Sequence, residues 1–172
     1  GSRDRTFYAV GADGREKWRF AVAGAVVASP ALGADGTIYF GSADQRMYAL
    51  FPDGRKRWDY FTNGDIQASP VLGADGTVYF AALDASFYAL EPLSGAVRWR
   101  VSLESNSVSS AAVRADGAVI LGADDGVVRA LDRANGAVLW RFDTRKAVPD
   151  DTIDSSPLIA PDGSIYFTSL DG

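Results

Sequence analysis

Four tryptophans recur along this chain at a nearly constant spacing. They are Trp18, Trp58, Trp99 and Trp140, separated by 40, 41 and 41 residues. Each follows a glycine by four positions, at Gly14, Gly54, Gly95 and Gly136. A period near 40 that recurs in several columns at once indicates one supersecondary unit copied in tandem. Because such a unit cannot bury its apolar face alone, the copies must stack on one another.

Two columns of tight-turn residues divide each copy. One column holds Asp35-Gly36, Asp75-Gly76, Asp116-Gly117 and Asp162-Gly163, and the other holds Asp13-Gly14, Asp53-Gly54, Ser94-Gly95 and Asn135-Gly136. Pairs of this kind tolerate positive φ and close antiparallel hairpins. The runs between them, such as Thr37–Phe40, are rich in the residue types that favour strands. No window has helical periodicity, so the sequence predicts an all-β fold.

Each copy predicts four short strands, and four-stranded units repeated at this period are typical of β-propeller blades. In the second copy, strands A to D, counted outward from the axis, are expected at residues 26–32, 37–41, 46–50 and 55–61. The chain then forms one propeller or half-propeller domain, residues 1–172, with four blade equivalents. These are a half-blade at 1–27, blades at 28–67, 68–108 and 109–154, and a half-blade at 155–172.

Composition excludes several classes of function. The net charge of −5 and the pI of about 4.7 argue against nucleic acid as a partner, because phosphates require a basic surface. Cysteine and histidine are both missing, which excludes disulfides, thiolate catalysis, Ser-His-Asp chemistry and metal sites built on those residues. No apolar run approaches 18 residues, so we expect no membrane insertion. We predict no catalytic residues and no enzyme activity.

The segments YALFPDGRKRW (48–58), YALEPLSGAVRW (88–99) and RALDRANGAVLW (129–140) resemble the tryptophan-docking motif of pyrroloquinoline-quinone (PQQ)-like propeller repeats. The preceding SPALGADGTIYFGS (29–42) is similar to repeats of quinoprotein-like and outer-membrane assembly lipoprotein families. The resemblance implies that the four tryptophans lie on outer strands. It also implies that they dock onto a neighbouring blade near steps such as Ala49-Leu50. An extracytoplasmic location, periplasmic or at the cell surface, is a further implication of the family.

Cofactor and assembly follow from the same resemblance. Quinoprotein dehydrogenases of this kind hold PQQ with calcium and commonly use adjacent cysteines, which this chain lacks. We therefore predict no cofactor and no metal, with a PQQ-binding half-propeller completed by dimerisation as the alternative. The family closes with about seven or eight blades, within the range of propellers generally. Four blade equivalents thus favour a homodimer forming an eight-bladed ring. A closed four-bladed monomer and an excised or engineered fragment without a native function are the alternatives.

Binding residues are expected where the copies differ. The D–A and B–C connections share one face, and the spacing from tryptophan to the next strand-A serine grows from 11 residues to 16 after Trp140. Variable loops on a rigid scaffold commonly bind partners. We therefore predict a scaffold module that binds a protein or small ligand through this face. The expected contact residues are Asn63, Asp65, Gln67, Glu104, Asn106, Arg145, Lys146, Asp150, Asp151 and Asp154.

The recurring turn aspartates have a separate expectation. One turn column holds Asp44, Asp84, Asp125 and Asp171, with Asp4 in the first half-copy. Such residues commonly accept hydrogen bonds from the backbone of their own turn, and we predict that role rather than cation binding. For the run Asp150-Asp151-x-x-Asp154, calcium binding through the carboxylate oxygens is an alternative to contact with a partner.

Overall fold

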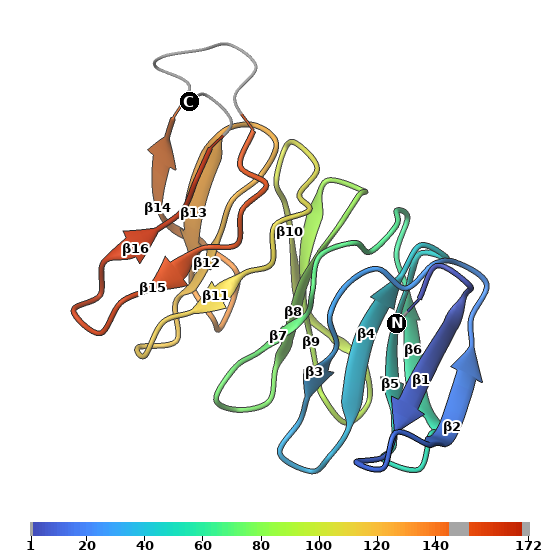
Figure 1. Ribbon diagram of the computed structural model, residues 1–172. Helices are drawn as coiled ribbons and strands as arrows, with labels where there is room; N and C mark the ends of the chain where they lie inside the picture. Colours follow the sequence, from blue (N-terminus) through green and yellow to red (C-terminus); the bar gives the residue numbers. More distant parts are fainter. Residues whose placement is uncertain (1, 145–151, 170–172) are drawn as a thin grey trace.

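Antiparallel sheets stand side by side along an open arc in the computed structural model, which describes residues 2–144 and 152–169 (Figure 1). The strands are β1 (Thr6–Val10), β2 (Glu16–Ala21), β3 (Ala31–Leu32), β4 (Ile38–Ser42), β5 (Arg46–Leu50), β6 (Lys56–Phe61), β7 (Val71–Leu72), β8 (Val78–Ala82), β9 (Ser86–Leu90), β10 (Val97–Ser102), β11 (Ala112–Val113), β12 (Val119–Leu121), β13 (Val127–Leu131), β14 (Val138–Asp143), β15 (Leu158–Ile159) and β16 (Ile165–Tyr166). Those described ranges contain no helix, and the all-β prediction is confirmed.

Each sheet is a meander in which a strand pairs with the next one along the chain. Blade I is β3–β6, blade II is β7–β10 and blade III is β11–β14, each with four strands. The N-terminal hairpin (β1–β2) and the C-terminal hairpin (β15–β16) form separate two-stranded sheets. They lie at opposite ends of the arc (Figure 1). The chain therefore does not adopt the closed four-bladed ring that was one of the alternatives.

The innermost strand is shorter than the sequence predicts. Residues 26–32 were expected to form strand A, yet β3 spans only Ala31–Leu32. Pro30 has no N–H to donate, and the Ser29 N–H donates to Ser69 Oγ of blade II at 3.0 Å instead of joining its own sheet. Equivalent hydrogen bonds run from Ser69 N to Ser110 Oγ and from Ser110 N to Ser156 Oγ. We call these bonds the serine chain. It uses the backbone of the inner strands to tie each blade to the next.

The core consists of four clusters, each between two neighbouring sheets. One face of blade I contributes Tyr39 and Trp58 to a cluster that includes Phe80 and Leu90 of blade II. Equivalent clusters join blade II to blade III and each terminal hairpin to its neighbouring blade. Strands β8 and β9 are buried along their whole length because both faces of blade II are covered. Burial of apolar area between the sheets is thus the main force that holds the arc together.

Tryptophans on the outer strands link each sheet to the next. The Trp58 indole N–H donates to the Pro92 carbonyl oxygen in the β9–β10 turn of blade II, at 2.9 Å. Trp18 bonds Pro52 O in the same way at 3.0 Å, and Trp99 bonds Arg133 O at 2.8 Å. Each acceptor lies 34 residues beyond its tryptophan. We call the β1–β2, β5–β6, β9–β10 and β13–β14 turns the docking turns.

Candidate functional site

The D–A connections lie against the B–C turns. Within blade I the Ile66 N–H donates to Ser42 O at 3.2 Å. The next residue back, Asp65, accepts a hydrogen bond through its backbone oxygen from Leu83 N of blade II at 2.9 Å. Asn106 O accepts from Asp124 N of blade III in the same way, also at 2.9 Å. Each connection therefore bridges two blades, and its backbone is fixed while its side chains remain available.

The predicted contact residues on this face come from three connections. Asn63, Gln67, Glu104, Asn106 and Asp154 are exposed, and Asp65 is half-buried. Burial first, and then the charges of Asp154 and Asp125, raise the pKa of Asp124 in the B–C turn of blade III. Arg145, Lys146, Asp150 and Asp151 lie outside the described residues.

The turn aspartates within the described residues divide into two groups, and Asp171 lies outside those residues. Asp4 and Asp125 accept from Thr6 N and Val127 N of their own turns, as predicted. For Asp44 and Asp84 the prediction is wrong. Asp44 accepts from Ala23 N of the preceding connection at 2.9 Å and from the Tyr48 hydroxyl at 2.8 Å.

Asp84 repeats this arrangement, with Asn63 N at 3.3 Å and the Tyr88 hydroxyl at 2.5 Å. In both blades the preceding connection brings an N–H within reach of the carboxylate. Burial and the hydrogen bond to the aspartate raise the pKa of Tyr48 and of Tyr88. Both phenols therefore stay protonated and donate. These aspartates thus join blades rather than only shaping a turn.

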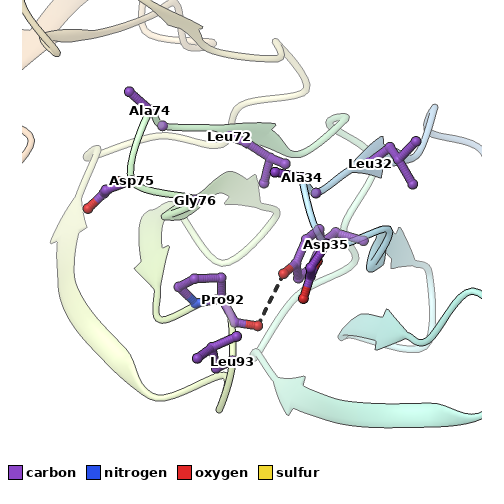
Figure 2. A pocket seen from close by; sticks show the side chains of 12 residues that line it. Leu32, Ala34, Asp35, Leu72, Ala74, Asp75, Gly76, Pro92 and Leu93 are labelled. Carbon is purple, nitrogen blue, oxygen red and sulfur yellow. Dashed lines mark hydrogen bonds between the residues drawn. The ribbon is translucent and has the colours of Figure 1, made fainter.

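The opposite face carries a hollow that sequence reasoning missed. It has a volume of about 610 Å³ and lies between the A–B turns of blades I and II and the docking turn of blade II (Figure 2). Leu32, Leu72, Pro92 and Leu93 give it an apolar lining, and the Tyr39 hydroxyl bonds Pro92 O at 3.1 Å beside it. The signal in the sequence was the leucine that precedes the Gly-Ala-Asp-Gly turn in two successive copies, at Leu32 and Leu72. Considered one turn at a time, each leucine resembles an ordinary strand residue.

The carboxylates at this hollow are not suited to acid–base chemistry. A hydrogen bond from the Thr37 backbone, followed by the Arg57 guanidinium, lowers the pKa of Asp35 to about 2. Thr77 and Arg98 lower the pKa of Asp75 to about 2, despite partial burial. Both groups are ionised near neutral pH and are already paired, so neither is placed to transfer a proton.

In the part of the chain that the structure describes, no three acidic side chains gather closely enough to hold a metal ion. Nor does this part contain a helix of the length and apolarity required to cross a membrane.

Comparison with known proteins identifies the repeat. The family model described as outer membrane protein assembly factor BamB matches residues 1–74 and 52–171. Among solved structures, BamB from Moraxella catarrhalis superposes with a TM-score of 0.84 at 21% identity, over 99% of this chain and 51% of that chain. The computationally designed Ika8 protein superposes with a TM-score of 0.79 at 17% identity, over 98% of this chain and 54% of that one.

The chain thus spans about half the length of these two structures. No curated protein is similar enough to count as a match. The two family matches overlap and together cover nearly every residue, and the blades described above have the fold of the solved relatives. The chain therefore belongs to the BamB family of PQQ-like β-propeller repeat proteins.

Proposed function

We propose that this chain is a non-catalytic propeller scaffold that binds a protein partner through the D–A/B–C face. The observation that carries the proposal is the combination of exposed polar side chains with a fixed backbone. Asn106 has an exposed side chain, while its carbonyl oxygen is held by Asp124 N of the next blade. A side chain presented in this way loses little further backbone entropy when a partner binds.

The family suggests the kind of partner. Its model is described as an outer membrane protein assembly factor. We propose a partner among proteins that assemble the outer membrane, and an extracytoplasmic location for this chain. Because the chain spans about half of the BamB structure, these assignments rest on the shared repeat and on the exposed face.

Site-specific photocrosslinking in the envelope fraction of the source cells tests the proposal. A photoreactive amino acid placed at Gln67 or Glu104 is expected to capture a protein partner. The same group at Ala74 or Leu93, on the opposite face beside the hollow, serves as the matched control. Capture from the hollow positions alone would move the binding site to the A–B/C–D face and contradict this assignment.

Titration with PQQ and calcium tests the absence of a cofactor. We expect no saturable change in absorbance or tryptophan fluorescence, because the described residues offer no acidic donor set. Saturable binding at low micromolar PQQ would instead support the quinoprotein alternative.

A further inference from the structure

The two ends of the arc expose apolar side chains whose counterparts inside the arc are buried. Tyr166 is 60% exposed, whereas Tyr39 and Tyr79 at the same repeat position are 1% and 2% exposed. At the other end, Val10 is 59% exposed while its counterpart Leu50 is fully buried. Among the described residues, β16 pairs only with β15 and β1 only with β2, so each terminal hairpin is half of a blade.

One end has an indole without a docking turn. Trp140 is the fourth member of the tryptophan column, and its ring lines an apolar groove of about 510 Å³ with Val128, Phe142, Ile165 and Phe167. Trp18, Trp58 and Trp99 all donate to a carbonyl oxygen of the next docking turn. Within residues 2–144 and 152–169, the Trp140 N–H has no such acceptor.

The other end has a docking turn without an indole. A Cβ placed on Gly54, Gly95 or Gly136 would lie 2.7–2.8 Å from the ring of a docked tryptophan. A Cβ on Gly14, the equivalent glycine of the β1–β2 turn, would have nothing within 4 Å. Gly14 has the same left-handed backbone, with φ of 77°, so this docking turn is preformed and open.

The serine chain is open at the same two ends. It runs from Ser29 through Ser69 and Ser110 to Ser156, each N–H donating to the next Oγ. Over the described part of the chain, Ser156 N has no acceptor and Ser29 Oγ has no donor of this kind. The C-terminal end thus offers donors, in Trp140 and Ser156, and the N-terminal end offers the matching acceptors.

The free strand edges have a register that the whole blades define. In blade I, Ile38 opposes Leu50, Tyr39 opposes Ala49 and Phe40 opposes Tyr48. Blade II repeats the same three pairs one unit later along the chain. The corresponding pairs between β16 and β1 are Ile165 with Val10, Tyr166 with Ala9 and Phe167 with Tyr8.

We propose that these ends bind a second copy of the chain head to tail, so that the C-terminal hairpin of each copy and the N-terminal hairpin of the other form one four-stranded blade. One chain cannot make this contact by itself, since its hairpins lie at opposite ends of the arc (Figure 1). The indole and serine contacts repeat those that join blades I and II, and the strand pairing repeats that of β4 with β5 inside blade I. Two such composite blades close the ring and leave neither edge strand unpaired. Six whole and two composite blades then make eight.

Sedimentation equilibrium of the full chain gives the first test. A dimer has twice the 18.3 kDa mass of the chain. Because each copy carries a net charge of −5, added salt is expected to strengthen association by screening repulsion. A mass of 18.3 kDa at every concentration and salt condition would overturn the proposal.

Two variants locate the interface. Trp140→Ala removes the undocked indole, and Gly14→Asn fills the open docking turn with a residue that tolerates positive φ. Each variant is expected to raise the dimer dissociation constant about tenfold or more, because it alters both junctions. Val97→Ala is the control, because it removes an exposed apolar side chain from the outer strand of a whole blade and should change nothing. A wild-type dimer that neither variant weakens would place the interface elsewhere.

Mixing the two variants distinguishes head-to-tail from other arrangements. In a heterodimer of Trp140→Ala and Gly14→Asn, one junction contains both changes and the other contains neither. Since the two changes remove the same contact, the second costs little once the first is present. Heterodimers should therefore form in preference to either homodimer. Purely statistical mixing would contradict the arrangement.

Cysteine pairing provides a readout that does not depend on affinity. The chain has no cysteine, so Ala9→Cys and Tyr166→Cys introduce the only thiols. Residues directly opposed across antiparallel strands bring their Cβ atoms close to disulfide distance. Mixing the two single variants under mild oxidation should give a disulfide-linked dimer, whereas neither variant alone should do so. Efficient cross-linking of either variant with itself, or no linkage in the mixture, would reject the β1–β16 pairing.

Discussion

A single glycine in each docking turn meets two requirements at once. Gly95 has φ of 72°, which favours glycine, and a Cβ there would lie 2.8 Å from ring carbons of Trp58. The sequence revealed the turn because Gly follows Asp, Ser or Asn in every copy. It could not reveal the second requirement, because the indole comes from a residue 37 positions away on another sheet.

Removing one buried indole should weaken the fold measurably. Trp58 packs in the cluster between blades I and II and bonds Pro92 O. Trp58→Ala is expected to lower the free energy of unfolding by about 3–5 kcal/mol, because it leaves a cavity between two sheets. Urea titration measures the change, with Trp140→Ala in dilute protein as the comparison. Equal losses for both variants would contradict the docking of Trp58.

Two paired carboxylates should make stability depend on acid pH. The pKa values of Asp35 and Asp75 are about 2 in the folded chain, below the ordinary value of 3.8. A lowered pKa means that the folded state holds the charged form more strongly than the unfolded state does. The stabilisation is therefore complete above the ordinary value and is lost as the pH falls through about 2.

Asp35→Asn tests this dependence, because the amide cannot ionise. The free energy of unfolding of the wild type should fall from about pH 4 to about pH 2, and that of Asp35→Asn should fall less steeply. Urea titrations across this range provide the comparison. Parallel slopes for the two proteins would show that the Arg57–Asp35 pair does not stabilise the fold.

The bounds of the outer three strands of a blade could be predicted from the sequence, whereas those of the innermost strand could not. Predicted strands 46–50 and 55–61 nearly coincide with β5 and β6, since short runs that contain aromatic residues lie between clear turns. Strand A was predicted too long because its serine N–H bonds to the next blade. The D–A/B–C face was identified as a set of variable loops, but its hydrogen bonds between blades depend on neighbours far along the chain.

Hydrogen exchange should separate the strands by position in the arc. In dilute protein, backbone amides of β1 and β16 are expected to exchange orders of magnitude faster than those of β8 and β9. β8 and β9 are buried throughout and paired on both sides, whereas β1 and β16 each have one unpaired edge among the described residues. Raising the protein concentration should slow exchange in β1 and β16 only. Slowing in β8 to the same degree would point to general stabilisation instead.

At the scale of the whole molecule, periodicity predicted the blade architecture but not its closure. Four blade equivalents are compatible with a small ring, half of a large ring or a fragment, and small axial residues suit all three. The structure excludes the closed four-bladed ring, because the terminal hairpins lie at opposite ends of an open arc. The same ends carry complementary groups, and these support the pairing of two copies.

The indole N–H groups of the four tryptophans test the central claim most directly. Their hydrogen exchange can be followed by NMR as the protein is concentrated. Trp18, Trp58 and Trp99 should stay protected at every concentration, since each donates to a carbonyl oxygen within its own chain. Trp140 should exchange rapidly in dilute protein and become protected as dimers form. Rapid exchange at Trp58 and Trp99, or protection of Trp140 that does not depend on concentration, would contradict the account.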